Sequence, residues 1–391
     1  MRTPEDDLAP LHAAALHRVV RPLDSAQAPV IRIRNREILN FSSNDYLGLA
    51  NAEPVRMAFK HGVDLYGAGS GSSRLVCGTL PPHQFLERTL SAYKKTEAAL
   101  TFSSGYAAAM GTVPALCGPG DFVLLDKLSH ACLIDAAKLS GATLRVFPHN
   151  HTQKLEHLLQ WARSKAGEAS RILIITESIF SMDGDWADLW DIIRLKETYG
   201  ALLLLDEAHA FGIMGPQGRG LAAKLGVAGR VEIQMGTFSK AAGLSGGYIC
   251  GSADWIDLLI NRARSFIYST APSPALAHAA AEVVSHWLPS AYGEEKRARL
   301  WQNLSLLAQL SEGKIADPPS AIIPLIVGTE SDAMALSASL LDAGFLVPAI
   351  RFPTVAKGRA RLRLTLTAGH TAEQIEALAA TLIPQLPPVA S

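Results

Sequence analysis

The sequence predicts an α/β protein whose large domain is built on a mostly parallel sheet of seven strands. Seven short apolar runs lie in the middle of the chain, and most are continuously apolar, as in strands buried on both faces. Stretches with apolar residues at helical spacing separate them, such as Trp186 to Tyr199. Alternating strands and helices of this length are typical of a parallel sheet covered by helices. The runs are Ala98 to Phe102, Phe122 to Leu125, Thr143 to Phe147, Arg171 to Thr176, Ala201 to Leu205, Glu232 to Gly236 and Gly247 to Cys250.

The two ends of the chain have different patterns. We expect a helix over residues 11–20 and a β-hairpin over residues 30–41, where apolar and polar side chains alternate around a turn at Asn35-Arg36. After about residue 290 we expect a smaller α+β domain. Its elements are a long helix, a strand Ile322 to Val327, a helix Ser331 to Ala343, a short strand Leu346 to Ala349, an alternating strand Arg359 to Leu366 and a closing helix.

These patterns divide the chain into three parts. Residues 1–45 form an N-terminal helix and hairpin segment, residues 46–290 the large α/β domain, and residues 291–391 the small C-terminal domain. Neither an internal repeat nor a low-complexity linker is present in the sequence.

Composition excludes several classes of function. Lys and Arg number 36 and Asp and Glu also number 36, so the basic excess typical of nucleic-acid-binding proteins is missing. The four cysteines form no C-x-x-C pair, which argues against a zinc site and fits a reducing compartment. No apolar run approaches the roughly 18 residues that span a bilayer. We therefore expect a cytoplasmic protein without a metal, a nucleic-acid partner or a membrane partner.

Ionisable and hydroxyl side chains follow five of the predicted strands. Because ligands bind beyond the carboxyl ends of parallel strands, these residues are expected to share one edge of the sheet and form one site. They are Ser103 to Tyr106, then Asp126, Ser129 and His130, then Glu177, Ser181 and Asp183, then Asp206, Glu207 and His209, and finally Thr237 to Lys240.

Lys240 and Asp206 are the first candidates for chemistry. A lysine just beyond a buried strand can be desolvated, which lowers the pKa of its amine and suits it to covalent chemistry with carbonyl groups. Asp206 follows four leucines and needs a partner, such as the protonated ring nitrogen of pyridoxal phosphate. The alternatives are a solvated loop lysine and an aspartate that caps a turn.

Ser104-Gly105-Tyr106 opens a helical stretch directly after a strand, and the free N–H groups of such a helix start suit a phosphate. An ordinary helix cap explains the same residues. His130 and His209 are each compatible with a structural role, but their place beside Asp206 and Lys240 favours a role in the site.

Four further features of the sequence have both a functional and a structural interpretation. The sequence Asp206-Glu207-Ala208-His209 matches a helicase box, but the phosphate-binding loop that this box requires is absent. The glycine-rich stretch 67–71 is followed by Ser72 where a dinucleotide fingerprint needs glycine, so it is interpreted as a loop of the active site or of a subunit edge. Arg351 could bind a substrate carboxylate through two hydrogen bonds or lie at the surface. The alternating arginines 359, 361 and 363 are interpreted as a solvated strand face.

Together these residues resemble the α-oxoamine synthases, which are pyridoxal-phosphate enzymes with the aspartate aminotransferase fold. The resemblance covers nearly the whole chain in the expected order. Its matching stretches are NFSSNDYLGL at 40–49, SIFSMDGD at 178–185, LLLLDEAHAFGIMGPQGRG at 202–220, GTFSKAAGLSGG at 236–247, IYST at 267–270 and RFPTVAKGRARLRLTLTAGHT at 351–371.

The resemblance implies a role for each matching residue. Lys240 would link covalently to pyridoxal 5'-phosphate, Asp206 would pair with its ring nitrogen, and His130 would stack on the ring. His209 and Ser181 would contact the ring oxygen, and Gly105, Tyr106 and Thr237 would bind the phosphate.

The resemblance also implies the residues that meet the substrates. Arg351 would bind the amino-acid carboxylate, Thr354 would lie near the acyl thioester, and Arg18 or Arg21 would border the substrate channel. A homodimer is implied as well, in which Ser269 and Thr270 lie near the cofactor phosphate of the partner subunit.

The resemblance also implies an acyltransferase reaction. Within the family the chain is most similar to the enzymes of biotin synthesis, which condense L-alanine with pimeloyl-CoA or pimeloyl-acyl carrier protein and release CO2. Condensation of glycine with acetyl-CoA is the sibling alternative, and transamination is a further one. A helicase-like module and a catalytically silent binding protein are the alternatives from other classes.

Overall fold

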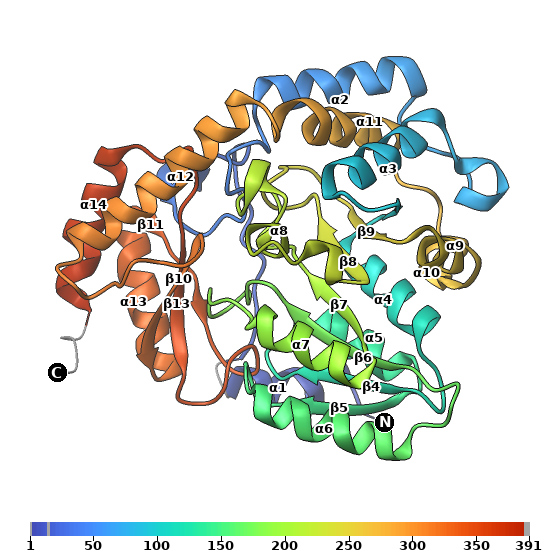
Figure 1. Cartoon of the computed structure of the whole chain (residues 1–391). Helices are drawn as coiled ribbons and strands as arrows, with labels where there is room; N and C mark the ends of the chain where they lie inside the picture. Colours follow the sequence, from blue (N-terminus) through green and yellow to red (C-terminus); the bar gives the residue numbers. More distant parts are fainter. Residues whose placement is uncertain (1, 14–15, 387–391) are drawn as a thin grey trace.

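The computed structural model describes residues 2–13 and 16–386, and its centre is a seven-stranded sheet in the order β3-β9-β8-β7-β6-β4-β5 (Figure 1). All neighbours pair in parallel except β9, which is antiparallel to both β3 and β8. Each predicted strand is present to within one residue at either end, so this prediction is confirmed. The strands are β3 (Ala98–Phe102), β4 (Phe122–Asp126), β5 (Thr143–Phe147), β6 (Ile172–Glu177), β7 (Leu202–Asp206), β8 (Ile233–Thr237) and β9 (Gly247–Gly251).

Helices cover both faces of this sheet, which explains why its strands are continuously apolar. Along β6, Leu173 and Ile175 pack into one apolar core, while Ile172 and Ile174 pack into the other. The helices of the first core are α4 (Gly105–Leu116), α5 (Ala131–Leu139), α9 (Ala253–Arg262) and α10 (Arg264–Ile267). Those of the second include α3 (Pro81–Lys94), α6 (Thr152–Lys165), α7 (Leu189–Tyr199), α8 (Leu221–Lys224) and α11 (Pro274–Glu282).

A long helix, α2 (Glu53–Tyr66), packs against α11 beside the sheet. Short helical turns complete this part of the chain. They are η1 (Arg74–Gly78), η2 (Pro216–Gly218), η3 (Ala228–Arg230) and η4 (Val283–Trp287).

The small domain is an antiparallel sheet with helices against it. Strands β10 (Ile322–Gly328), β13 (Ala360–Thr365) and β12 (Ala349–Ile350) form this sheet in the order β10-β13-β12. Its helices are α12 (Ala291–Leu310), α13 (Glu330–Asp342), α14 (Ala372–Leu382) and η5 (Ile383–Gln385). One apolar core contains both Leu203 of the large sheet and Leu362 of β13, so the two domains share part of their core. The domain boundaries drawn from the sequence stay a prediction.

The predicted strand Leu346 to Ala349 is wrong. The chain instead forms two short strands in different sheets, because β11 (Phe345–Leu346) pairs with the N-terminal hairpin and β12 pairs with β13. Pro348 lies between them and has no N–H group to donate to a ladder, so one continuous strand is disfavoured there.

The N-terminal segment contains the expected hairpin and a displaced helix. Strands β1 (Val30–Ile33) and β2 (Arg36–Asn40) are antiparallel around Arg34-Asn35, one residue before the predicted turn. The helix predicted over residues 11–20 is wrong, since α1 spans Pro4–Ala13 and residues 16–20 are not helical. Proline and three acidic residues fill the first turn of α1, a composition that favours the start of a helix. Residues 14 and 15 of that prediction lie outside the described residues. No helix within residues 2–13 and 16–386 is both long and apolar enough to cross a membrane.

Candidate active site

Lys240 lies in the turn that joins β8 to β9 at the carboxyl edge of the sheet. Its side chain is half-buried, and burial lowers the pKa of its amine, while the nearby carboxylates of Asp206 and Glu177 raise it. Backbone hydrogen bonds hold the turn, from Gly243 N–H to Lys240 O at 2.9 Å and from Phe238 N–H to Gly246 O at 3.0 Å. Lys240 therefore lies in a partly buried turn directly after a strand, as the sequence led us to expect, and its role in the site stays a prediction.

Asp206 is the last residue of β7 and is 6% exposed. Its Oδ1 accepts the backbone N–H of Ala208 at 2.9 Å, and Oδ2 has no hydrogen-bond partner among the described residues. Burial raises the pKa of this carboxyl, and the Lys240 amine opposes that shift. A buried carboxylate with one unused oxygen fits a cationic donor such as a protonated ring nitrogen.

Glu177 completes the charged cluster, although the sequence analysis gave it no role. It is the last residue of β6 and pairs in register with Asp206 of β7, so the two carboxylates lie side by side at the same edge. Burial raises the pKa of Glu177 to about 8, and the Asp206 charge adds to that shift. The backbone N–H groups of His130 and Ser181 both bind its carboxylate. Its place at the end of a buried strand is the signal that had already grouped it with the other residues expected at this edge of the sheet.

His209 follows β7 and is 4% exposed. Its Nδ1 lies 2.7 Å from the Tyr46 hydroxyl, which also donates to Asn44 Oδ1 at 3.2 Å. Burial lowers the pKa of His209 well below its usual value, so the ring is neutral. The network places this ring beside Lys240, whose charge lowers the same pKa further.

The two β13 arginines nearest the site are buried, so the prediction that this strand presents a solvated face is wrong. Arg361 and Arg363 are 3% and 5% exposed. Arg363 Nε donates to Ser181 O at 2.6 Å, and its Nη1 donates to Asn44 at 3.1 Å. Arg361 Nη1 donates to Met182 O at 2.9 Å and to Asp183 Oδ1 at 2.6 Å. Both side chains thus hold the loop that carries Ser181, rather than facing water.

The predicted phosphate site lies where β3 turns into α4. Ser104 caps this helix by accepting the N–H of Ala107 at 3.0 Å, and Gly105 is its first residue. A Cβ added at Gly105 would stand 3.6 Å from the Cβ of Thr237, so the Thr237 side chain lies beside the helix start. The Tyr106 hydroxyl bonds to Asp135, so the backbone N–H of Tyr106 is the group of this residue that is proposed for a phosphate.

His130 is the N-cap residue directly before α5, and the residue is exposed. Its Nδ1 accepts the N–H of Cys132 at 3.2 Å, which fixes the ring orientation. Partial burial lowers the pKa of His130, and the Asp206 charge opposes the shift. An exposed, oriented ring beside Asp206 and Lys240 fits a role against the face of a planar cofactor.

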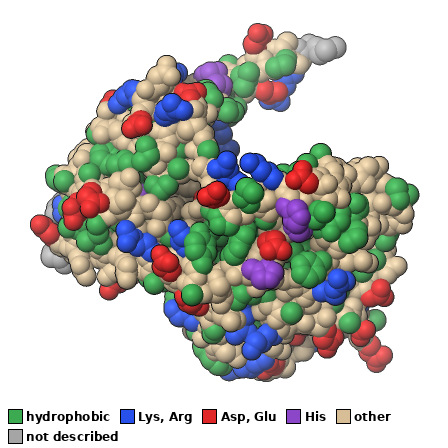
Figure 2. Space-filling view, turned by 90° about the horizontal axis from the view of Figure 1, so that it is seen from above, with side chains coloured by type: hydrophobic (Ala, Val, Ile, Leu, Met, Phe, Trp, Pro, Cys, Tyr) green, Lys and Arg blue, Asp and Glu red, His purple; other side chains and the backbone are tan. Residues whose placement is uncertain are grey.

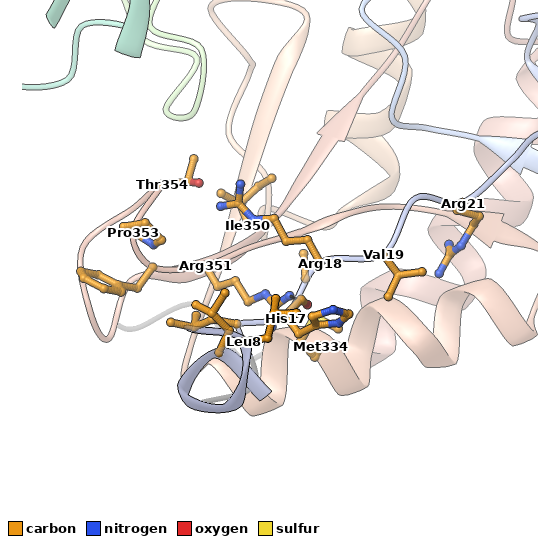
Figure 3. Close-up of a pocket in the computed structure, with 14 residues that line it drawn as sticks. Leu8, His17, Arg18, Val19, Arg21, Met334, Ile350, Arg351, Pro353 and Thr354 are labelled. Atoms are coloured by element: carbon orange, nitrogen blue, oxygen red, sulfur yellow. Dashed lines mark hydrogen bonds between the residues drawn. The ribbon is translucent and has the colours of Figure 1, made fainter. Parts of the chain in front are cut away.

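The four predicted substrate residues line one pocket of about 940 Å³ (Figure 3). Arg351 and Thr354 come from the segment after β12, and Arg18 and Arg21 come from the N-terminal segment. Arg351 Nη2 donates to His17 O at 3.4 Å and so joins the two segments. None of the cluster around Lys240 lines this pocket, so the structure gathers the candidates into two groups. Ionisable side chains of both signs surround a hollow in the face shown in Figure 2.

The residues present fit pyridoxal 5'-phosphate. They supply a desolvated amine, a buried carboxylate with an unused oxygen, an exposed imidazole and a capped helix start with a hydroxyl beside it. Within the described part of the chain, no cluster of three or more His, Cys, Asp or Glu side chains could hold a metal ion.

Comparison with known proteins agrees with this chemistry. Residues 36–382 match the family model for aminotransferase class I and II. The chain is 43% identical, over 98% of its length, to an 8-amino-7-oxononanoate synthase of Anaeromyxobacter dehalogenans, of which it covers 96%. A structure of SPT with PLP has a TM-score of 0.91 and 27% identity, with 98% of each chain covered.

A crystal structure of 8-amino-7-oxononanoate synthase from Francisella tularensis has a TM-score of 0.74 and 28% identity, and the match covers 89% of this chain and 97% of that one. The chain therefore belongs to the 8-amino-7-oxononanoate synthases, which are pyridoxal-phosphate-dependent acyltransferases of the α-oxoamine synthase family within aminotransferase class I and II.

Proposed function

We propose that this protein condenses L-alanine with a pimeloyl thioester to give 8-amino-7-oxononanoate, CO2 and the free thiol carrier, as a step of biotin biosynthesis. The observation that carries the proposal is the buried cluster of Lys240, Asp206 and Glu177 at one sheet edge, in a chain with relatives of that name over 98% of its length. A cytoplasmic location is part of the proposal.

Pyridoxal 5'-phosphate, when bound, withdraws electrons from the substrate carbon. Asp206 would hold a negative charge at the ring nitrogen, and His130 and Ser181 would hold the ring through its face and its oxygen. His209, neutral in its buried network, would contact the same oxygen. The N–H groups of Gly105 and Tyr106 and the Thr237 hydroxyl would bind the phosphate.

The remaining steps belong to Lys240 and the pocket. Burial lowers the pKa of the Lys240 amine, so the amine can accept the proton that leaves the alanine Cα and return it after decarboxylation. The Arg351 guanidinium binds the alanine carboxylate through two hydrogen bonds, which orients the Cα. Thr354, Arg18 and Arg21 line the same pocket, where Thr354 would lie near the acyl thioester and Arg18 or Arg21 would border the acyl channel.

The test is alanine-dependent release of CO2 and thiol from pimeloyl-CoA, repeated with pimeloyl-acyl carrier protein. We expect release with alanine and at least one of the two pimeloyl donors, and none when the amino acid is omitted. Faster thiol release from glycine with acetyl-CoA would contradict the proposal and favour the sibling reaction. Amino-group exchange without CO2 would indicate a transaminase.

We also propose that the protein forms a homodimer. Support comes from large apolar side chains that are exposed around η1 and the segment before α11, among them Leu75 at 53%, Val76 at 77% and Tyr268 at 70%. Thr270 of that segment forms a β-bridge to Ser73, so the two regions form one surface. Sedimentation velocity should show a dimer that Val76→Asp weakens. Leu139→Asp, at another site that is 60% exposed, is the matched control. A monomeric wild-type protein would contradict the proposal.

A further inference from the structure

His149 binds two carboxylates, one with each ring nitrogen. Its Nδ1 lies 3.2 Å from Asp126 Oδ1, and its Nε2 lies 2.8 Å from Asp185 Oδ2. Carboxylates only accept hydrogen bonds, so a ring that donates to both carries a proton on each nitrogen and is cationic. The side chain is 23% exposed and packs edge-on against Phe180, with ring centroids 4.3 Å apart.

The Asp126 end of this bridge organises the turn that presents His130. Asp126 is the last residue of β4, and its Oδ1 also accepts the N–H of Leu128 at 2.8 Å. Its backbone oxygen accepts the N–H of Ser129 at 3.1 Å, and His130 follows directly. The position of Asp126 therefore influences the position of the His130 backbone, from which the imidazole ring extends.

The Asp185 end closes the loop that carries Ser181. The N–H of Phe180 donates to Asp185 O at 3.1 Å, and the N–H of Gly184 donates to Phe180 O at 2.8 Å, so the loop is tied at its base. The second carboxylate oxygen, Asp185 Oδ1, is buried and makes no hydrogen bond within the described residues. The His149 ring is thus the ion-pair partner of the Asp185 carboxylate.

We propose that His149 is a positioning residue, which as a cation ties the turn before His130 to the loop of Ser181 and so sets the spacing of these two residues across the cofactor ring. The proposal rests on the roles given to His130 and Ser181 in the proposed function. Glu177 binds the backbone N–H groups of the same two residues directly, whereas His149 acts on them through the carboxylates of Asp126 and Asp185.

The charge state of His149 follows from its neighbours. Burial lowers the pKa of the ring, but hydrogen bonds and charge from Asp126 on β4 and from Asp185 in the loop after β6 outweigh burial and raise the pKa to about 10. The amide of Asn150, 3.4 Å from Nε2, is neutral. Since the folded pKa exceeds the usual 6.5, the bridge contributes its full stability below about pH 6.5 and loses it as pH rises through about 10.

His149→Gln is the main test, with His157→Gln as its control, since His157 is an exposed histidine on the neighbouring helix α6. We expect His149→Gln to lower kcat by about 10- to 100-fold, the range seen for groups that orient metal ligands, with a smaller change in KM. The circular dichroism of bound pyridoxal phosphate, recorded without substrates, should change in His149→Gln and not in His157→Gln.

Two further measurements separate positioning from mere loss of folding. In the apo protein, the midpoint of thermal unfolding should fall between pH 8 and about pH 10 in wild type, and this fall should be absent in His149→Gln. Asp185→Asn should reproduce the cofactor signal, and the double variant should be no worse than either single one. Unchanged cofactor dichroism together with kcat within about twofold of wild type would overturn the proposal. Because the dichroism needs no substrate, it stays informative if the condensation reaction itself proves wrong.

Discussion

At the scale of single residues, three ionisable groups at one sheet edge determine what the site can do. Lys240, Asp206 and Glu177 each stand at or just after the end of a buried strand, and each has a pKa shifted first of all by burial. The shifts bring the amine and the carboxyls closer to the range in which they exchange protons near neutral pH.

Replacing the amine tests this reading directly. Lys240→Ala should lower turnover by at least about 10²- to 10⁴-fold, since it removes the proposed proton acceptor, while pyridoxal phosphate should still bind without a covalent link. Single-turnover kinetics and equilibrium dialysis of the cofactor measure the two effects. Borohydride treatment of wild type should attach the cofactor to Lys240, and an adduct mapped to another residue would contradict the assignment.

The same scale shows what sequence reasoning can and cannot find. Lys240 and Asp206 could be predicted because residue type and place after a strand are both local. The burial of Arg361 and Arg363 could not, because their partners Asp183, Ser181 and Asn44 are far away in the chain. The alternation of arginine with apolar residues resembled a half-solvated strand, but the arginine face is covered by the loop of the large domain.

At the scale of elements, the start of α4 depends on how closely β9 approaches it. A Cβ added at Gly247 of β9 would stand 2.5 Å from Ser104 O and 2.6 Å from the Gly105 nitrogen. Only glycine fits at this contact, because the atoms it meets are backbone and have no rotamer to change.

Gly247→Ala should therefore destabilise the protein by about 1–3 kcal/mol, as overpacking does, and weaken cofactor binding by displacing the proposed phosphate site. Denaturant unfolding and spectroscopic titration with pyridoxal phosphate measure the two effects. Gly118→Ala is the control, since an added Cβ meets nothing within 4 Å there. Equal stability and equal affinity of the two variants would show that the helix start tolerates the displacement.

The elements themselves were largely predictable where one physical signal dominated. Burial on both faces makes the strands of the large sheet continuous in apolar character, and every one was found. The apolar pattern failed to predict the secondary structure where contacts with distant segments of the chain determine it. The chain at 345–350 is divided between two sheets, and residues 16–20 are not helical although the sequence suggested a helix there.

At the scale of the whole molecule, the small domain is tied to the large one through the Ser181 loop. Arg361 of β13 binds Met182 and Asp183, and Ser320, just before β10, donates to Gly184 O at 2.7 Å. Because Arg351 lies in the small domain and Lys240 in the large one, these contacts influence how the two proposed groups of site residues stand relative to each other.

Arg361→Gln should lower the free energy of unfolding by about 1–3 kcal/mol, because it leaves the buried loop with unsatisfied acceptors. It should also raise KM for alanine, since Arg351 shifts with the small domain. Arg359→Gln, an exposed position just before the same strand, is the control. Calorimetry and steady-state kinetics give both quantities, and identical values for the two variants would mean that the loop contacts do not couple the domains.

The turn that bears Lys240 has a mechanical consequence. Both ends of it enter adjacent strands, and its backbone is closed by its own hydrogen bonds. The Lys240 backbone is therefore held in place, and the amine changes position by rotation about the side-chain bonds. Side-chain rotation is a local motion, so the amine can change position without a movement of the two strands or of the turn between them.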